Sequence, residues 1–131
     1  MKSPAGMVAE RLVDLSIGSL GSSTGWSINV SREPVLPDQC ITVYDTGGGQ
    51  HDTDQLDISY PTFQVRVRAG VYPDAFAKAV AIRSALQGST FTVEGLSFED
   101  VAVATDIADL GKDDQNRSLL TINFRAMMQP A

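Results

Sequence analysis

Residues 62–69 read Thr-Phe-Gln-Val-Arg-Val-Arg-Ala, a regular alternation of polar and apolar side chains. A period of two places successive side chains on opposite faces of a β-strand. The apolar set is expected to face a core, and the polar set, with Arg66 and Arg68, to face the other way. The sequence therefore predicts a half-buried strand with two arginines on its polar face.

Five further segments carry weaker strand patterns of alternating or β-branched residues. They are residues 26–30, 40–44, 90–93, 98–105 and 118–127. The glycine run 47–49 is expected to end the second of these, and residues 109–117 are expected to form a turn-rich connection. Residues 50–57 lack a regular apolar pattern and are interpreted as an exposed loop.

Two segments have helical periodicity. The first covers residues 3–17, with Ser3 as the N-cap and Gly18 as a left-handed stop. The second runs from Pro73 to about residue 87, and Arg83 falls inside its apolar stripe. That stripe consists of Ala75, Phe76, Ala79, Val80, Ile82 and Leu86.

The order of predicted elements is helix, three strands, helix, three strands. An α+β fold buries the apolar side of every element: a mostly antiparallel β-sheet with both helices packed against it. The length of 131 residues suits a single domain spanning residues 1–131.

The chain has 10 basic and 16 acidic residues and a formal net charge of −6. Such a balance argues against a groove that binds nucleic-acid phosphates, because such grooves are normally basic.

One cysteine, Cys40, cannot build a disulfide framework and is expected in the core. No apolar run is long enough to span a bilayer or to form a signal-peptide core, so we expect folding in a cytoplasm and no membrane partner.

No motif points to catalysis. The glycines at 47–49 lack the following helix and Lys-Ser/Thr of a phosphate loop, and the serines lie in turns rather than in a nucleophile elbow. Four residues could in principle ligate a divalent cation: His51, Asp52, Asp54 and Asp57. A solvated acidic loop explains them better, so we expect no cofactor, and a small metal-dependent enzyme is the weakest hypothesis.

Several polar residues on predicted strands and on the second helix suggest ion pairing. They are Arg66, Arg68, Arg83, Asn123 and Arg125. Their partners are expected either inside the chain or on a neighbouring subunit. Simple exposure to solvent is the alternative for the strand arginines.

Several longer sequence segments occur in a characteristic order. Residues 37–48 read Pro-Asp-Gln-Cys-Ile-Thr-Val-Tyr-Asp-Thr-Gly-Gly, and residues 63–69 and a helix starting at Tyr72 follow. Residues 110–117 then read Leu-Gly-Lys-Asp-Asp-Gln-Asn-Arg, and residues 121–125 read Thr-Ile-Asn-Phe-Arg. This order resembles the tail terminator (minor capsid) proteins of long-tailed bacteriophages. Asn116 replaces a family glycine in a turn one residue longer, but asparagine also tolerates the left-handed conformation.

The resemblance implies a structural virion protein and not an enzyme. Family members form a ring, usually of six subunits, which caps the head-proximal end of the tail tube, stops tube polymerisation and docks to the neck. The implied partners are further copies of the chain, the tail tube protein and a neck or head-completion protein. DNA would pass through the lumen without specific binding, and assembly would take place in the host cytoplasm. A connector on the portal side is the alternative.

We expect the sheet edges and the loop from Asp45 to Tyr60 to make ring and tube contacts, and acidic residues to line the channel. The candidate interface residues are Asp45, Gly47, Gly48, Gly49, His51, Asp52, Asp54, Asp57, Arg66, Arg68, Arg83, Arg117, Asn123 and Arg125.

Overall fold

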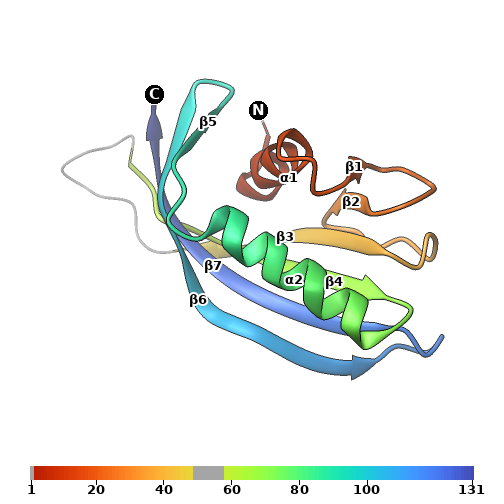
Figure 1. The fold of residues 1–131 in the computed structure, drawn as a ribbon. Helices are drawn as coiled ribbons and strands as arrows, with labels where there is room; N and C mark the ends of the chain where they lie inside the picture. Colours follow the sequence, from red (N-terminus) through yellow and green to blue (C-terminus); the bar gives the residue numbers. More distant parts are fainter. Residues whose placement is uncertain (1, 49–57) are drawn as a thin grey trace.

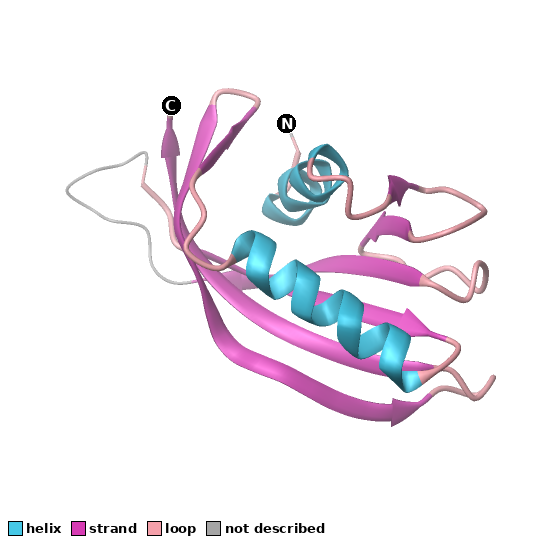
Figure 2. Ribbon diagram, viewed as in Figure 1, coloured by secondary structure: helices cyan, strands magenta, loops and turns pink. Residues whose placement is uncertain are grey.

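A computed structural model describes residues 2–48 and 58–131 of the chain. The described elements are α1 (Pro4–Asp14), β1 (Ser19–Leu20), β2 (Ser27–Val30), β3 (Cys40–Gly48), β4 (Pro61–Ala69), α2 (Tyr72–Leu86), β5 (Phe91–Val93), β6 (Leu96–Lys112) and β7 (Ser118–Pro130). All of these strands join one curled sheet in the order β1-β2-β3-β4-β7-β6-β5, with both helices on the same side of it (Figures 1 and 2).

The sheet is mixed, which corrects the prediction of a mostly antiparallel sheet. β1 pairs with β2, and β2 pairs with β3, in parallel. The other four pairings, β3 with β4, β4 with β7, β7 with β6 and β6 with β5, are antiparallel. A parallel pair requires the chain to return to the starting end of the sheet. Residues 31–39, which we call the strap, make this return between β2 and β3.

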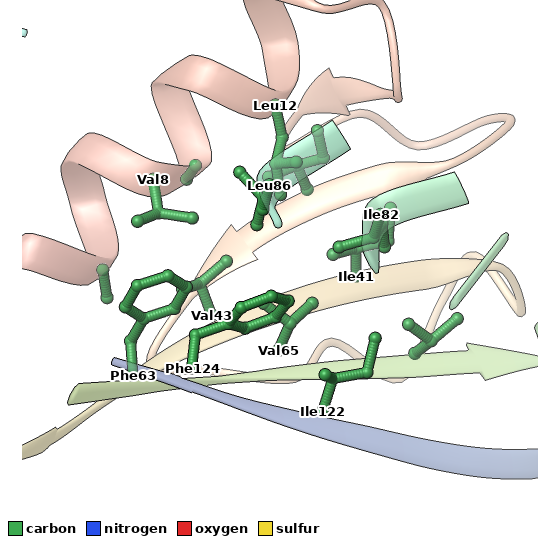
Figure 3. Packing of buried hydrophobic residues seen from close by; sticks show 14 of the residues in the cluster. Val8, Leu12, Ile41, Val43, Phe63, Val65, Ile82, Leu86, Ile122 and Phe124 are labelled. Atoms are coloured by element: carbon green, nitrogen blue, oxygen red, sulfur yellow. The ribbon is translucent and has the colours of Figure 1, made fainter. Parts of the chain in front are cut away.

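The alternation on β4 is confirmed. Its apolar residues Phe63, Val65 and Val67 are completely buried beneath the helices. Figure 3 shows Val8 of α1 and Leu86 of α2 pointing toward this same cluster. The Phe63 ring stacks on Phe124 of the adjacent strand, with 5.2 Å between ring centroids. One continuous core therefore lies between the sheet and both helices.

The start of α1 is confirmed, but its predicted end is wrong. Ser3 caps the helix by accepting a hydrogen bond from the Gly6 N–H at 3.1 Å. The helix ends at Asp14, and Ser16 rather than Gly18 takes the left-handed conformation, with φ of 60°. Gly18 is needed for a close approach instead, because a Cβ there would lie 2.6 Å from the Trp26 carbonyl oxygen.

Helix α2 confirms the second predicted helix, but its buried stripe is narrower than predicted. The buried positions are Ala75, Ala79, Ile82 and Leu86. Phe76 was expected among them and is 41% exposed. Its ring stacks on Tyr72 on the outer side of the helix, with centroids 5.8 Å apart.

Cys40 is fully buried, as predicted, and this burial raises the pKa of its thiol.

Several strands differ from the predicted boundaries. β1 was not predicted, β3 continues into the glycine run as far as Gly48, and β6 extends to Lys112 through residues expected in a turn. The turn itself is shorter, and Asn116 takes its left-handed position with φ of 63°, as its side chain permits. Four register shifts interrupt the pairing of β6 with β7, so this long hairpin is irregular.

Within the described ranges 2–48 and 58–131, neither helix is long and apolar enough to cross a membrane.

Candidate subunit interface

The sheet face opposite the helices, which we call the open face, is polar. Cross-strand pairing places Thr42, Arg66 and Thr121 in one row, and Tyr44, Gln64 and Asn123 in the next. The Gln64 side-chain amide donates to the Asn123 side-chain oxygen at 3.1 Å. The polar half of the β4 alternation thus joins polar residues from its neighbours, of which Thr42 and Thr121 are buried and Tyr44 and Asn123 are half-buried.

Arg68 differs from the other polar residues of β4 because its side chain is only 2% exposed. Its guanidinium donates to backbone carbonyls of the strap, to Pro37 at 2.7 Å and to Asp38 at 3.1 Å. It also lies 3.5 Å from the Glu33 carboxylate. Arg68 therefore holds the strap against the open face, where buried carbonyls would otherwise lose hydrogen bonds.

Arg117 provides a second anchor for the strap. Its guanidinium donates to the Val35 carbonyl and lies 3.3 Å from the Asp38 carboxylate. It also donates to Asp113 within its own turn, at 2.8 Å. Although desolvation raises the pKa of Asp113, hydrogen bonds from the backbone N–H and guanidinium of Arg117, and from the Gln115 N–H, outweigh it and lower this pKa overall. The turn and the strap are thereby joined through one buried arginine.

The remaining predicted arginines are more exposed. Arg66 Nε lies 3.3 Å from Glu33 Oε2, and its side chain is 31% exposed. Arg83 on α2 pairs with Asp106 on β6 at 2.9 Å, and this hydrogen bond lowers the pKa of Asp106. Arg125 is exposed on the open face, where it lines a shallow pocket with Asp100. Internal ion pairing, one of the two expected arrangements, is therefore present for Arg66, Arg68, Arg83 and Arg117.

Three predicted residues near the end of β3, Asp45, Gly47 and Gly48, have local structural roles. Asp45 accepts a hydrogen bond from the Ala5 N–H at 2.9 Å and so caps the first turn of α1. Gly48 has φ of 153°, and a Cβ there would lie 2.6 Å from the Tyr60 carbonyl oxygen. Gly47 also has a positive φ, of 91°. Gly48 therefore serves the close approach of β3 to the start of β4, whereas at Gly47 only the positive φ favours glycine, because a Cβ there would meet no atom within 4 Å.

The other predicted loop residues lie outside the described residues. They are Gly49, His51, Asp52, Asp54 and Asp57. Residues 2–48 and 58–131 contain no group of three or more His, Cys, Asp or Glu residues arranged to hold a metal ion. The hypothesis of a metal site at His51 stays a prediction.

The outer edge of β6 was expected to make contacts, and its backbone is partly occupied. β5 covers only Leu96 to Phe98, so the edge from Glu99 onward has no strand beside it among the described residues. Three of its N–H groups donate to side chains: Val103 to Gln87 at 2.7 Å, Ile107 to Asp106 at 2.7 Å and Gly111 to Asp109 at 2.8 Å. Together with the register shifts, these bonds hinder addition of another strand.

The same segment concentrates the charge of the protein. Residues 94–114 contain seven acidic residues and one basic residue, a net of −6 that equals the formal charge of the whole chain. The described acidic side chains along β6 include Asp100, Asp106 and Asp109, which are exposed. One margin of the sheet is therefore strongly acidic, and the rest of the sequence is balanced.

Sequence reasoning missed the strap. Val35 is 65% exposed and Leu36 is 70% exposed, whereas Glu33 and the strap carbonyls face the buried arginines. The available signal was the pair Pro34 and Pro37, which mark residues that leave the sheet ladder. It could not show that the segment crosses the open face.

Comparison with solved structures supports the fold. A chain from the virion of a native gene transfer agent (GTA) particle has a TM-score of 0.72 at 14% identity, covering 97% of this chain and 95% of that chain. A second solved structure has a TM-score of 0.57 at 14% identity, covering 95% of this chain and 91% of that one. No curated protein sequence matches the chain.

The family assignment rests on the sequence itself. The family model described as bacteriophage tail terminator protein matches residues 12–129, which include the strap, the open face and the β6–β7 hairpin. This is a family of structural virion proteins rather than of enzymes. The chain belongs to the bacteriophage tail terminator family and has a structural role in a phage tail.

Proposed function

We propose that this chain forms a closed ring, expected to contain six subunits, on the head-proximal end of a phage tail tube. The ring stops tube polymerisation and provides the surface to which the neck or head-completion protein docks. The observation that carries the proposal is the family match over residues 12–129. The GTA virion chain, with its TM-score of 0.72, is an example of the same fold in a virion.

Capping requires a subunit whose two exposed sides differ. One side of this sheet carries both helices and the other carries the strap and polar rows, so a ring presents two unlike surfaces. Only one of them has to match the last ring of the tube. Side chains accept hydrogen bonds from three N–H groups on the outer edge of β6, so this edge does not readily pair with another strand. This supports an assembly that does not grow further through the β6 edge.

Passage of DNA requires a channel that does not hold it. We assign the acidic margin of residues 94–114 to the channel, where its net charge of −6 repels the duplex. Asp114→Lys is then expected to slow DNA ejection without blocking assembly, and Asp14→Lys on α1 is the matched control. Equal ejection rates for both variants would remove this assignment.

The direct experiment mixes purified protein with polymerised tail tubes and with tailless heads, and examines both by negative-stain electron microscopy. A terminator adds a ring to one end of each tube and blocks further elongation by tube subunits. Binding to heads alone would favour the alternative, a connector on the portal side. Absence of ring-shaped assemblies, both free and on tubes, would contradict the proposed function.

A further inference from the structure

The strap turns its apolar side chains outward. Val35 and Leu36 are adjacent in sequence, and both are more than 60% exposed. Their position is not a result of loose attachment, because Arg68 and Arg117 both donate hydrogen bonds to the Val35 carbonyl. Two buried cations therefore hold an exposed apolar tip in one conformation, as a preorganised contact surface requires.

A matching apolar groove lies beside α1. It has a volume of about 360 Å³, near the lower end of the range typical of ligand pockets, about 300–1,000 Å³. Val13, Leu20 and Val30 provide apolar walls. Leu20 is itself 64% exposed, and the Lys2–Glu10 ion pair lies at the same groove. This is the arrangement of an apolar contact centre with a polar rim.

The strap tip cannot fill the groove of its own subunit. Arg68 and Arg117 place the tip on the open face, near the pairing of Cys40, Arg68 and Leu119. The groove lies on the other side of the sheet, where α1 packs, and reaches Val30, which pairs with Val43. The sheet separates the two surfaces, so a tip and a groove can meet only between different copies of the chain.

We propose that the Val35–Leu36 tip of one subunit inserts into the groove lined by Val13, Leu20 and Val30 of the next subunit. The two surfaces differ, so the contact is heterologous and repeats head to tail until the ring closes. This inference rests on the proposed ring function and names the contact that would build it. Side chains of the size of valine and leucine suit the apolar walls of the groove.

Disulfide cross-linking tests the contact directly. The double variant Leu20→Cys/Leu36→Cys, assembled with tail tubes and oxidised, is expected to give a covalent ladder up to the full ring on non-reducing gels. Cys40 does not compete because it is completely buried. A mixture of the two single variants should stop at covalent dimers, because each subunit then supplies only one partner of the pair.

Two controls separate the possible results. Leu20→Cys/Leu110→Cys pairs the groove with a different exposed apolar residue, 51% exposed on β6, and should not cross-link. Dimers formed by Leu36→Cys alone would indicate tip against tip and would overturn the heterologous contact. Assembly into rings without cross-linking of the Leu20/Leu36 pair would also overturn it while leaving the proposed function intact. Absence of any assembly would instead contradict the proposed function.

A second variant avoids cysteine chemistry. Leu36→Ser leaves the strap carbonyls and both arginines in place, so the fold is expected to remain unchanged by circular dichroism. Ring formation should require at least about tenfold more protein, because the tip loses its largest apolar group. An unchanged concentration dependence would contradict the contact, and Leu110→Ser is the matched control.

Discussion

The two faces of β4 are made by alternate residues of the same strand, yet they depend on different kinds of contact. Phe63, Val65 and Val67 are completely buried against both helices. On the other face, Arg66 is partly exposed and Arg68 is buried beneath the strap. Apolar burial is non-directional, so the covered face needs only suitable side chains. The open face depends on particular hydrogen-bonding partners from a distant segment.

The strongest test of this comparison removes an aromatic ring from the covered face. Phe124→Ala leaves a cavity beside Phe63 and should lower the free energy of unfolding by about 3–5 kcal/mol. Urea denaturation measures this change. Phe76→Ala, on the outer side of α2, is the matched control and should cost less than about 1 kcal/mol. Similar losses for the two variants would mean that the core is not where the structure places it.

The second test removes the anchor of the open face. Arg68→Ala leaves Glu33 and the strap carbonyls without their buried donor, and should cost about 2–3 kcal/mol. It should also release the strap, so limited trypsin digestion should cleave faster after Arg32. Arg66→Ala is the control, since its side chain is 31% exposed. If Arg66→Ala accelerated cleavage as much as Arg68→Ala, the strap would not depend on the buried arginine.

The third test uses acid, which acts on the ionic contacts but not on the apolar face. The pKa of Asp113 is lower in the folded protein than its unfolded value of about 3.9. Its carboxylate therefore stabilises the fold above that value, and the stabilisation is lost as pH falls through the folded pKa. Asp113→Asn should flatten the acid side of a stability profile measured from pH 7 to pH 2. An acid side that is unchanged in Asp113→Asn would mean that this carboxylate does not stabilise the turn.

The smallest effect is expected for the ion pair between α2 and β6. Arg83 and Asp106 have side chains that are 35% and 64% exposed. Exposed pairs contribute about 0–1 kcal/mol, so Arg83→Ala should reduce stability by less than about 1 kcal/mol. Thermal denaturation at low and high salt provides the measurement. A larger loss that salt does not reduce would show that Arg83 stabilises the fold mainly through side-chain packing.

The face of the sheet that the helices cover could be predicted from the sequence. The spacing of apolar residues within a short stretch shows which side chains share one face of a strand or helix. This logic located β4 and most of α2, whereas the burial of Cys40 was expected from the residue type and not from periodicity. It failed for Phe76, since an aromatic residue at the edge of a helical stripe can turn outward and stack on Tyr72. It also failed at Ser16, where backbone geometry rather than residue type ended α1.

The open face could be predicted only in part. The sequence suggested ion pairing for Arg66 and Arg68 but left simple exposure to solvent open, because their partners, Glu33 and the strap carbonyls, lie about thirty residues away along the chain. Long-range polar contacts leave no periodic signal. For the same reason, the parallel pairing of β2 with β3 was missed, because it depends on the route of the strap and not on either strand.

The side-chain bonds along the β6 edge have a consequence for the protein before it meets its partners. In a free subunit, an unpaired strand edge favours fibrous aggregation. Gln87, Asp106 and Asp109 occupy N–H groups on this edge, and the nearby carboxylates repel one another. The free subunit is thereby protected from self-association through β6, the longest of the described strands.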